Sequence, residues 1–483
     1  MESPTVKELP GEKLFIGGGW VSGGNFLEVT DKFTNKTIAA IATADEELVE
    51  MAVHSAEAGL VAMKTLPALK RSAILEKISN ALREAADEFA AGIIAEAGKP
   101  AKFARQEVER SIQTFKFAAE EAKRLHGETV PLDAQSGSEK KFGFYHRFPI
   151  GVVLAITPFN FPLNLVAHKL APALAAGCSV ILKPSSLTPL TALKLAKIVE
   201  FAGAPAGAFN VLVGSGDTVG NWLVAHPKVA MVTFTGSAVV GKQIREKAGL
   251  KKTLLELGNN SAAIVDETAD LDWAAQRCAA GAFAYSGQVC ISLQRIFVEK
   301  SVAKLFTEKL VNLAKNLKVG DPKLGTTDVG PLISEPDARR VEDWIAEAKA
   351  AGLEVKCGAR RKNAFYEPTV LYGDPSGCRI GTEELFGPAV TVTPYDKFEK
   401  AVESVNSTRY GLQAALFTKN LNRAFAAFRE LEVGGVIIND SPAYRADMMP
   451  YGGVKESGSG REGVRYAIEE MTYLKMAALH LPE

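Results

Sequence analysis

The sequence predicts an α/β fold in which parallel sheets carry helices on both faces. Three observations predict it. The 483 residues are too many for one ordinary core, so two or three domains are expected. The composition, 47% hydrophobic and 23% charged, is that of a globular protein able to bury a large core. From residue 151 onward, short apolar runs alternate with helical segments, which is typical of doubly wound sheets.

Residues 44–124 are predicted to be helical. Within 69–100 the apolar residues recur at close to 3.6 positions, which predicts one amphipathic helix ended by Gly98 and Pro100. Its apolar stripe comprises Ile74, Ile78, Leu82, Ala85, Phe89 and Ile93. The segment 140–147 alternates as a strand does.

Two series of buried strands follow, with a soft boundary near Gly258. The first series comprises 151–156, 179–184, 210–214, 230–236 and 261–266, with a helix at 188–203. The second comprises 295–300, 387–395, 414–418 and 434–440, with a helix from about residue 301. The closing segment, 469–481, is expected to be an edge strand that could pair with a partner chain.

Composition also excludes several classes of protein. Lys+Arg and Asp+Glu number 56 each, so neither a nucleic acid nor a membrane surface is an expected partner. The polar N-terminus lacks the apolar core of a signal peptide, and no apolar stretch reaches the roughly 20 residues that span a bilayer. The five cysteines form no CxxC pair, which favours reduced thiols in the cytoplasm and no metal site.

Polar residues lie where several predicted strands end, the edge at which such sheets bind ligands. Lys183 is either a surface lysine or an anchor for a ribose hydroxyl or phosphate. Glu256 is either a carboxylate paired in a buried network or a general base whose pKa is raised by apolar neighbours. Asn160 either fixes its own turn or directs its amide N–H at a developing oxyanion.

Two strand–glycine–helix junctions could hold a dinucleotide pyrophosphate at a helix N-terminus. These are "GSGDTVG" (214–220) and "FTGSAVVG" (234–241). The first has GxGxxxG spacing, not the GxGxxG fingerprint, and a tight turn explains its glycines equally well.

Cys290, in "FAYSGQVCIS", is either a small buried residue or a nucleophile. Gly287 permits a sharp backbone path, and a nearby helix or loop terminus could lower the thiol pKa. The six histidines show no obvious pairing with Cys290, so a Cys–His hydrolase has little support.

Six stretches, in order over nearly the whole chain, resemble the aldehyde dehydrogenase superfamily, in particular its lactaldehyde and non-phosphorylating glyceraldehyde-3-phosphate dehydrogenase-like branch. Glu256 and Cys290 have the family's separation. The stretches are "TPFNFPLNLVAHKLAPALAAGCSVILKPS" (157–185), "FTGSAVVGKQI" (234–244), "LLELGNNSAAIV" (254–265), "GQVC" (287–290), "EELFGPAV" (383–390) and "PYGGVKESGSGREG" (450–463).

The resemblance implies a role for each matching residue. Cys290 would add to the aldehyde carbon, Asn160 and the Cys290 N–H would hold the oxyanion, and Glu256 would activate water to hydrolyse the thioester. Lys183 and Glu384 would bind a ribose, and Phe386 would pack near the nicotinamide ribose. Lys183 is also implied as one of the catalytic residues. The remaining cofactor residues implied are Ile156, Thr157, Pro158, Phe159, Ser186, Gly216, Phe234, Gly236, Ser237, Val240 and Leu257.

The resemblance also implies three parts: a Rossmann-like NAD(P)-binding domain (1–125 and 148–258), an α/β catalytic domain (259–440) and a small β oligomerisation arm (126–147 and 465–483). A homodimer or homotetramer is expected.

Four positions bear on specificity. Ser186 stands where NAD-preferring members carry a glutamate, so NADP is expected to be accepted as well as NAD. Tyr285 stands where many members have asparagine, and in this respect the chain resembles the branch that includes semialdehyde and non-phosphorylating glyceraldehyde-3-phosphate dehydrogenases. Members of that branch often carry arginine just before the nucleophile, where this chain has Val289. An anchor for an anionic substrate is therefore missing. Arg445 lies in the region of the substrate-pocket rim, either as a solvated loop arginine or in contact with an acidic group.

The expected reaction is NAD(P)-dependent oxidation of a small aliphatic or hydroxy-aldehyde to its acid. The alternatives are a semialdehyde dehydrogenase, a CoA-acylating enzyme and a non-catalytic binding or structural member. Glu256 argues against the acylating class, which typically lacks the hydrolytic glutamate. Retention of Asn160, Glu256 and Cys290 together argues against a non-catalytic protein.

Overall fold

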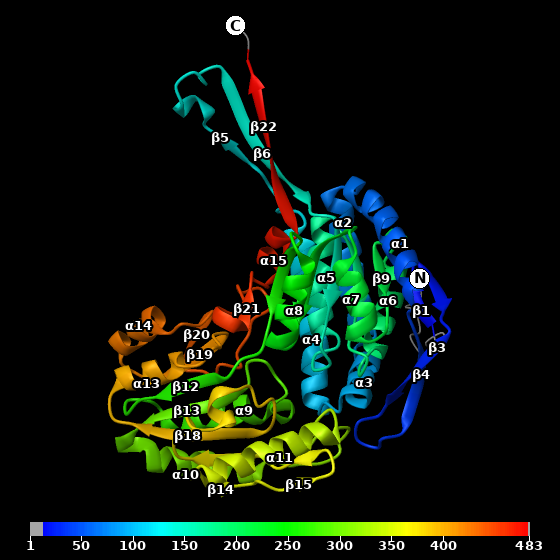
Figure 1. The fold of residues 1–483 in the computed structure, drawn as a ribbon. Coiled ribbons are helices and arrows are strands. Elements are labelled where there is room, and N and C mark those ends of the chain that lie inside the picture. Colours follow the sequence, from blue (N-terminus) through cyan, green and yellow to red (C-terminus); the bar gives the residue numbers. More distant parts are fainter. Residues whose placement is uncertain (1–12, 482–483) are drawn as a thin grey trace.

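Two open, mostly parallel sheets organise the chain, and a narrow β arm projects from the first of them (Figure 1). This computed structural model describes residues 13–481. The segments 1–12 and 482–483 lie outside the described residues, and so does most of the polar N-terminus on which the absence of a signal peptide was predicted. Within the described range, no helix has the length and apolarity needed to cross a bilayer.

The first sheet has the strand order β2-β1-β9-β8-β7-β10-β11-β21, and its five strands from β9 to β11 are parallel. The order reverses between β7 and β10, which creates a crevice at their carboxyl ends. Its strands are β1 (Lys13–Ile16), β2 (Gly19–Ser22), β7 (Val152–Ile156), β8 (Ser179–Lys183), β9 (Phe209–Val211), β10 (Val229–Thr235), β11 (Lys252–Glu256) and β21 (Gly458–Ser459). A separate hairpin joins β3 (Asn25–Thr30) and β4 (Thr37–Thr43).

Helices cover both faces of this sheet (Figure 1). They are α1 (Glu46–Thr65), α2 (Ala68–Glu84), α3 (Ala86–Ala97), α4 (Ala101–Glu121), α5 (Asn164–Ala176), α6 (Leu190–Phe201), α7 (Asn221–Ala225), α8 (Ala238–Ala248) and α15 (Val464–Glu470). The single helix predicted within 69–100 is wrong, because the chain leaves helical geometry at Ala85 (φ −95°, ψ 14°). Both α2 and α3 pack on α4 and contact α6, and α2 also contacts α5. The predicted stop is confirmed, since Gly98 is left-handed at φ 66°.

The second sheet has the strand order β14-β17-β18-β13-β12-β19-β20. The chain leaves the first sheet at Glu256 and enters the second at Ser261, on either side of the boundary predicted near Gly258. The strands are β12 (Ser261–Val265), β13 (Leu293–Glu299), β14 (Glu354–Cys357), β17 (Thr369–Tyr372), β18 (Ala389–Tyr395), β19 (Gln413–Phe417) and β20 (Gly435–Ile438). The accompanying elements are α9 (Leu271–Phe283), α10 (Lys300–Asn316), α11 (Glu335–Ala350), α12 (Arg379–Thr382), α13 (Phe398–Asn406), α14 (Leu421–Glu430) and the short pair β15 (Arg361–Lys362) and β16 (Phe365–Tyr366).

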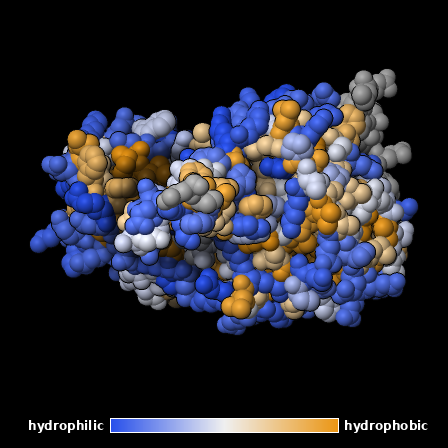
Figure 2. Space-filling view, turned by 90° about the horizontal axis from the view of Figure 1, so that it is seen from above, coloured by the Kyte–Doolittle hydropathy of each residue, from blue (hydrophilic) through white to orange (hydrophobic). Residues whose placement is uncertain are grey.

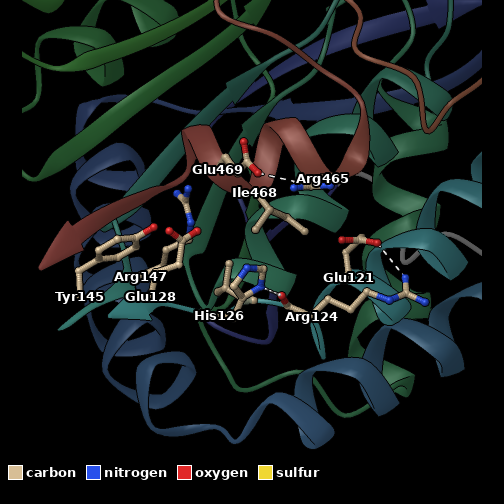
Figure 3. A pocket seen from close by; sticks show the side chains of 10 residues that line it. Glu121, Arg124, His126, Glu128, Tyr145, Arg147, Arg465, Ile468 and Glu469 are labelled. Carbon is tan, nitrogen blue, oxygen red and sulfur yellow. Dashed lines mark hydrogen bonds and ion pairs between the residues drawn. The ribbon is translucent and has the colours of Figure 1, made fainter. Parts of the chain in front are cut away.

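The arm is a three-stranded antiparallel sheet in the order β22-β6-β5, so β22 is an edge strand as predicted. Its strands are β5 (Glu128–Val130), β6 (Lys141–Pro149) and β22 (Thr472–His480). Where the arm meets α4 and α15, a pocket of about 100 Å³ is lined mainly by charged side chains (Figure 3). Arg124 pairs there with Glu121 at 2.8 Å and Arg465 with Glu469 at 3.3 Å, which balances their charges.

Candidate active site

A cavity of about 210 Å³ opens at the crevice of the first sheet, between β7 and β10, and reaches the second sheet's loops. Only Leu165, Thr235 and Gly258 among its lining residues were not predicted as site residues. The lining comprises Pro158, Phe159, Asn160, Leu165, Thr235, Gly236, Ser237, Leu257, Gly258, Cys290, Glu384 and Phe386. The fold therefore brings together residues that lie up to 228 positions apart, from Pro158 to Phe386.

Cys290 enters this cavity from a loop with an unusual backbone. Tyr285 (φ 48°), Ser286 (φ 56°) and Gly287 (φ 71°) are three consecutive left-handed residues. Gly287 is required there, because a Cβ atom would lie 2.1 Å from the Gly387 carbonyl oxygen. The half-buried Cys290 presents Sγ 3.1 Å from the hydroxyl of Tyr451.

The thiol of Cys290 is not activated by its surroundings in the way the sequence suggested. Burial raises its pKa to about 11, while the Tyr451 hydroxyl and the nearby Arg445 charge act in the opposite direction. The burial comes from an apolar cluster that also contains Val289, Ile291 and Met449. The thiol therefore keeps its proton near neutral pH until the electrostatics of the site change.

Asn160 lies in the loop after β7 and points toward the Cys290 loop. Its Nδ2 donates to the Gln288 carbonyl oxygen at 2.9 Å, a partner outside its own turn. An amide nitrogen carries two hydrogens, so the second N–H can serve another acceptor. Oδ1 of Asn160 is buried and has no hydrogen-bond partner among residues 13–481. This geometry ties Asn160 to the nucleophile loop and leaves one N–H for an oxyanion.

Glu256 ends β11 and is only 3% exposed. Neither of its carboxylate oxygens has a hydrogen-bond partner in the described part of the chain, so the paired-carboxylate alternative does not hold. Burial raises the pKa of Glu256 well above its ordinary value, and the Glu462 carboxylate raises it further. Gly452 gives Glu256 room, because a Cβ atom there would lie 2.8 Å from Oε1. A carboxylate of this kind accepts a proton readily, as a general base must.

Glu462 itself stays ionised. Burial alone would raise its pKa, but Lys169 and Arg445 bring the pKa down to about 2. Lys169 Nζ lies 2.8 Å from Oε1, and Arg445 Nη2 lies 3.1 Å from Oε2. A permanent negative charge is thus held beside Glu256 by two buried cations.

Two charged residues were predicted to bind the cofactor. Glu384 lines the cavity, whereas Lys183 does not. Lys183 is 5% exposed, which contradicts the surface-lysine alternative, and burial lowers its pKa to about 8. Its Nζ donates to the Pro184 carbonyl oxygen at 3.3 Å. Burial raises the pKa of Glu384 to about 7, and its Oε1 accepts from the Asn259 N–H at 3.1 Å. Both groups can exchange these weak contacts for ribose hydroxyls.

Aromatic rings border the same side. Phe386, at φ 51°, meets Phe159 edge to face with ring centroids 5.9 Å apart. Gly236 and Ser237 begin α8, where the Ser237 side chain accepts from the Val240 N–H at 3.3 Å. The donors, the aromatic walls and the glycine-lined turn fit a nicotinamide dinucleotide.

Seven predicted cofactor residues do not line the cavity itself. Ile156 and Phe234 are paired in the sheet register. Ser186 donates to the Gly214 carbonyl oxygen at 2.8 Å. Gly216 and Val240 lie at exposed helix starts. The seven are Ile156, Thr157, Lys183, Ser186, Gly216, Phe234 and Val240.

The three substrate candidates are placed differently from one another. Tyr285 is 1% exposed and donates its hydroxyl to the Ala97 carbonyl oxygen at 2.9 Å, away from the cavity. Val289 packs beside Cys290. The Arg445 side chain is 6% exposed, so the solvated-loop alternative is wrong. Its guanidinium lies 3.7 Å above the Tyr451 ring, and Nε has no hydrogen-bond partner among the described residues.

Sequence reasoning missed Tyr451, Glu462 and Lys169. Tyr451 stands between Pro450 and two glycines, a pattern that indicates a turn. Lys169 interrupts an apolar helix, and an unexplained charge in such a helix was the available signal.

Comparison with known proteins agrees with this geometry. The model of the aldehyde dehydrogenase family matches residues 20–477. The chain belongs to the aldehyde dehydrogenase family. A 3-sulfolactaldehyde dehydrogenase of Priestia aryabhattai is 47% identical over 468 residues, which are 97% of this chain and 98% of the relative.

Solved aldehyde dehydrogenases have the same fold. One is aldehyde dehydrogenase 21 of Physcomitrella patens in complex with its reaction product succinate, with a TM-score of 0.95, 42% identity and coverage of 98% of this chain and 99% of that one. Another is the glyceraldehyde-3-phosphate dehydrogenase GapN of Methanocaldococcus jannaschii complexed with NADP, with a TM-score of 0.91, 43% identity and coverage of 94% and 99%. This aldehyde dehydrogenase oxidises an aldehyde to its acid with NAD or NADP.

Proposed function

We propose that the substrate is a small hydroxy-aldehyde and that Cys290 is the nucleophile. The observation that carries the proposal is that Cys290 and Asn160 line one cavity, and that the unpaired Glu256 directly precedes the lining residue Leu257. The Cys290 thiol loses its proton to water, the thiolate adds to the carbonyl carbon, and the oxyanion accepts from the Asn160 side chain and the Cys290 N–H. When bound, the nicotinamide supplies the hydride acceptor, and a thioester remains on Cys290. Glu256 takes a proton from water, which attacks the thioester and releases the acid and the thiol.

Lys183 and Glu384 are proposed to hold the cofactor's ribose groups. Lys183 is buried and Glu384 is half-buried, and neither forms an ion pair within the described structure, which favours a ligand as the missing partner. Ser186 adds no negative charge near them, so a 2′-phosphate meets no repulsion. NADP is therefore accepted, in keeping with the NADP bound to the GapN relative.

A second candidate substrate class is an aldehyde with a terminal anion. The buried Arg445 guanidinium, with its unpartnered Nε, favours it. One relative is a 3-sulfolactaldehyde dehydrogenase, whose substrate carries a sulfonate, and a solved relative is in complex with its reaction product succinate. Val289 in place of arginine weighs against it.

The deciding experiment is a panel of lactaldehyde, 3-sulfolactaldehyde and succinic semialdehyde, each with NAD⁺ and NADP⁺ and with or without coenzyme A. A higher kcat/KM for lactaldehyde supports the first candidate, and a higher one for either anion supports the second. Acceleration by coenzyme A, with an acyl-CoA product, contradicts hydrolysis through Glu256.

We further propose that the chain divides as the family does, into 1–125 with 148–258, 259–440, and the arm of 126–147 with 465–483, and that the arm joins copies of this chain. Apolar side chains are exposed on β6 and the edge strand β22, among them Phe144, Leu474 and Met476. Figure 2, seen from above, shows apolar residues on the lobe that carries α13 and α14 as well as across the larger lobe. Exposed Leu421, Phe425 and Phe428 of α14 belong to that lobe.

Light scattering tests the assembly. The wild type is expected at a multiple of 51.6 kDa. Met476→Lys should lower the mass, whereas Leu305→Lys, on the exposed face of α10, should not. A monomeric wild type contradicts the proposal. The five cysteines, all in the described range and all unpaired, support a reducing compartment such as the cytoplasm.

A further inference from the structure

A buried lysine lies between the loop that carries Asn160 and the loop that carries Cys290. Lys99 follows α3 and is fully buried. Its Nζ lies 3.6 Å from the ring centroid of Phe161 and 4.5 Å from that of Tyr285. Phe161 is the residue after Asn160, and Tyr285 is five residues before Cys290. An ammonium group over two aromatic faces attracts both rings, so it holds the two loops against each other.

The counter-ion of Lys99 fixes the other end of the Asn160 loop. Glu107 of α4 forms a buried ion pair with Lys99. Its Oε1 also accepts from the backbone N–H groups of Leu163 at 2.9 Å and Asn164 at 3.1 Å, where α5 begins. One ion pair therefore contacts the loop beside Asn160 and again at its exit into α5.

The Cys290 loop needs such support, because its backbone is strained. A left-handed conformation costs a non-glycine residue about 1–2 kcal/mol, and Tyr285 and Ser286 both adopt it. Two hydrogen bonds oppose that cost: Tyr285 Oη donates to the Ala97 carbonyl oxygen at 2.9 Å, and Ser286 Oγ to that of Gly330 at 2.7 Å. Ala97 ends α3, so Tyr285 is anchored next to Lys99.

We propose that Lys99 and Tyr285 are positioning residues that set the separation between the Asn160 amide and the Cys290 backbone N–H, the two oxyanion donors. Neither residue touches the substrate cavity. The inference rests on the proposed function, since it assumes an oxyanion at that place. Catalytic donors must be held within about 0.5 Å of the productive geometry, so a shift of either loop weakens oxyanion stabilisation.

The test uses Tyr285→Phe, which removes one hydroxyl, and the shape-preserving double variant Lys99→Met with Glu107→Gln. Tyr395→Phe is the matched control, because its buried hydroxyl donates to the Val265 carbonyl oxygen at 3.4 Å in the second sheet. Three quantities are measured: the single-turnover rate of hydride transfer, acylation by p-nitrophenyl acetate, which forms an oxyanion without cofactor, and alkylation of Cys290 by iodoacetamide.

Both Tyr285→Phe and the double variant should slow hydride transfer and ester acylation by the same factor, about tenfold. Alkylation and the KM for NADP⁺ should stay within about twofold, and Tyr395→Phe should change none of these rates. If hydride transfer is unchanged in Tyr285→Phe, the proposal is wrong. The proposal is also wrong if the rates of alkylation and of hydride transfer fall by the same factor, because the substitution would then have changed the reactivity of the thiol and not the oxyanion donors. Should the double variant not fold, Tyr285→Phe decides. A wild type that oxidises no aldehyde would instead refute the proposed function.

Discussion

The hydroxyl of Tyr451 lies 3.1 Å from Sγ of Cys290, and the guanidinium of Arg445 lies 3.7 Å over the same tyrosine ring. Burial raises the pKa of Tyr451 well above its ordinary value, so its hydroxyl keeps its proton and can donate to sulfur. Burial raises the thiol pKa, and this contact lowers it. A tyrosine that lies 161 residues further along the chain therefore partly offsets the effect of burial on the Cys290 thiol.

Tyr451→Phe should make Cys290 less reactive. Removing the donor raises the thiol pKa further, so less thiolate is present at any fixed pH below that value. The rate of alkylation by iodoacetamide should fall about tenfold, which corresponds to ~1.4 kcal/mol. The pH dependence of alkylation measures the shift. Tyr444→Phe, a half-exposed tyrosine of the same loop, is the control. An unchanged pH profile in Tyr451→Phe would show that the contact does not affect the thiol.

Glu256→Gln should separate hydride transfer from hydrolysis. Gln cannot take a proton from water, so one equivalent of reduced cofactor should form in a burst. Steady turnover should then fall by about 100-fold or more. Stopped-flow absorbance of the reduced nicotinamide resolves the two phases. Unimpaired steady turnover would remove Glu256 from the mechanism.

The rate of deacylation should rise with pH as Glu256 loses its proton. Glu462→Gln should shift this rising limb of the pH–rate profile to lower pH. Burial and then the Glu462 charge hold the pKa of Glu256 high, so removing that charge lowers it. Lys169 and Arg445, left without their partner, lower it further. Glu256 is then ionised at lower pH, where deacylation speeds up. Loss of one partner from buried ion pairs should also cost about 3–5 kcal/mol of stability.

The rate of thioester hydrolysis measured against pH tests this shift. Glu469→Gln, which removes a solvent-exposed pair with Arg465, should leave the limb in place. Movement of the limb to higher pH in Glu462→Gln would contradict the assigned coupling.

Ser186→Glu should restrict the enzyme to NAD. The new carboxylate would repel a 2′-phosphate and accept from a 2′-hydroxyl, so the KM for NADP⁺ should rise about tenfold or more with little change for NAD⁺. Leu187→Glu adds the same charge at the next, more exposed position and should discriminate far less. Equal effects on both cofactors would place Ser186 away from the ribose.

The sequence predicted the strands well because parallel strands are buried on both faces. The expected strands 151–156 and 179–184 are observed as β7 (Val152–Ile156) and β8 (Ser179–Lys183), and Val153, Leu154 and Ile181 are fully buried. The break at Ala85 was not predictable, because neither proline nor glycine marks it and the apolar stripe continues across it.

Within the site, the residues recognisable from sequence were those in short motifs at strand ends, such as Asn160, Lys183 and Cys290. The electrostatic network was not predictable from the sequence. Lys169 and Glu462 are 293 residues apart, and no local spacing rule connects them. The expectation for Arg445 was incomplete for the same reason, because its burial depends on Tyr451 and Glu462 across a loop.

Mass spectrometry of Glu256→Gln, quenched after one turnover with lactaldehyde and NADP⁺, shows whether Cys290 carries the acyl group. The peptide containing residues 283–292 should gain the mass of one lactoyl group, less one hydrogen, on Cys290. An unmodified Cys290 during a full burst of reduced cofactor, or an adduct on another residue, would contradict it.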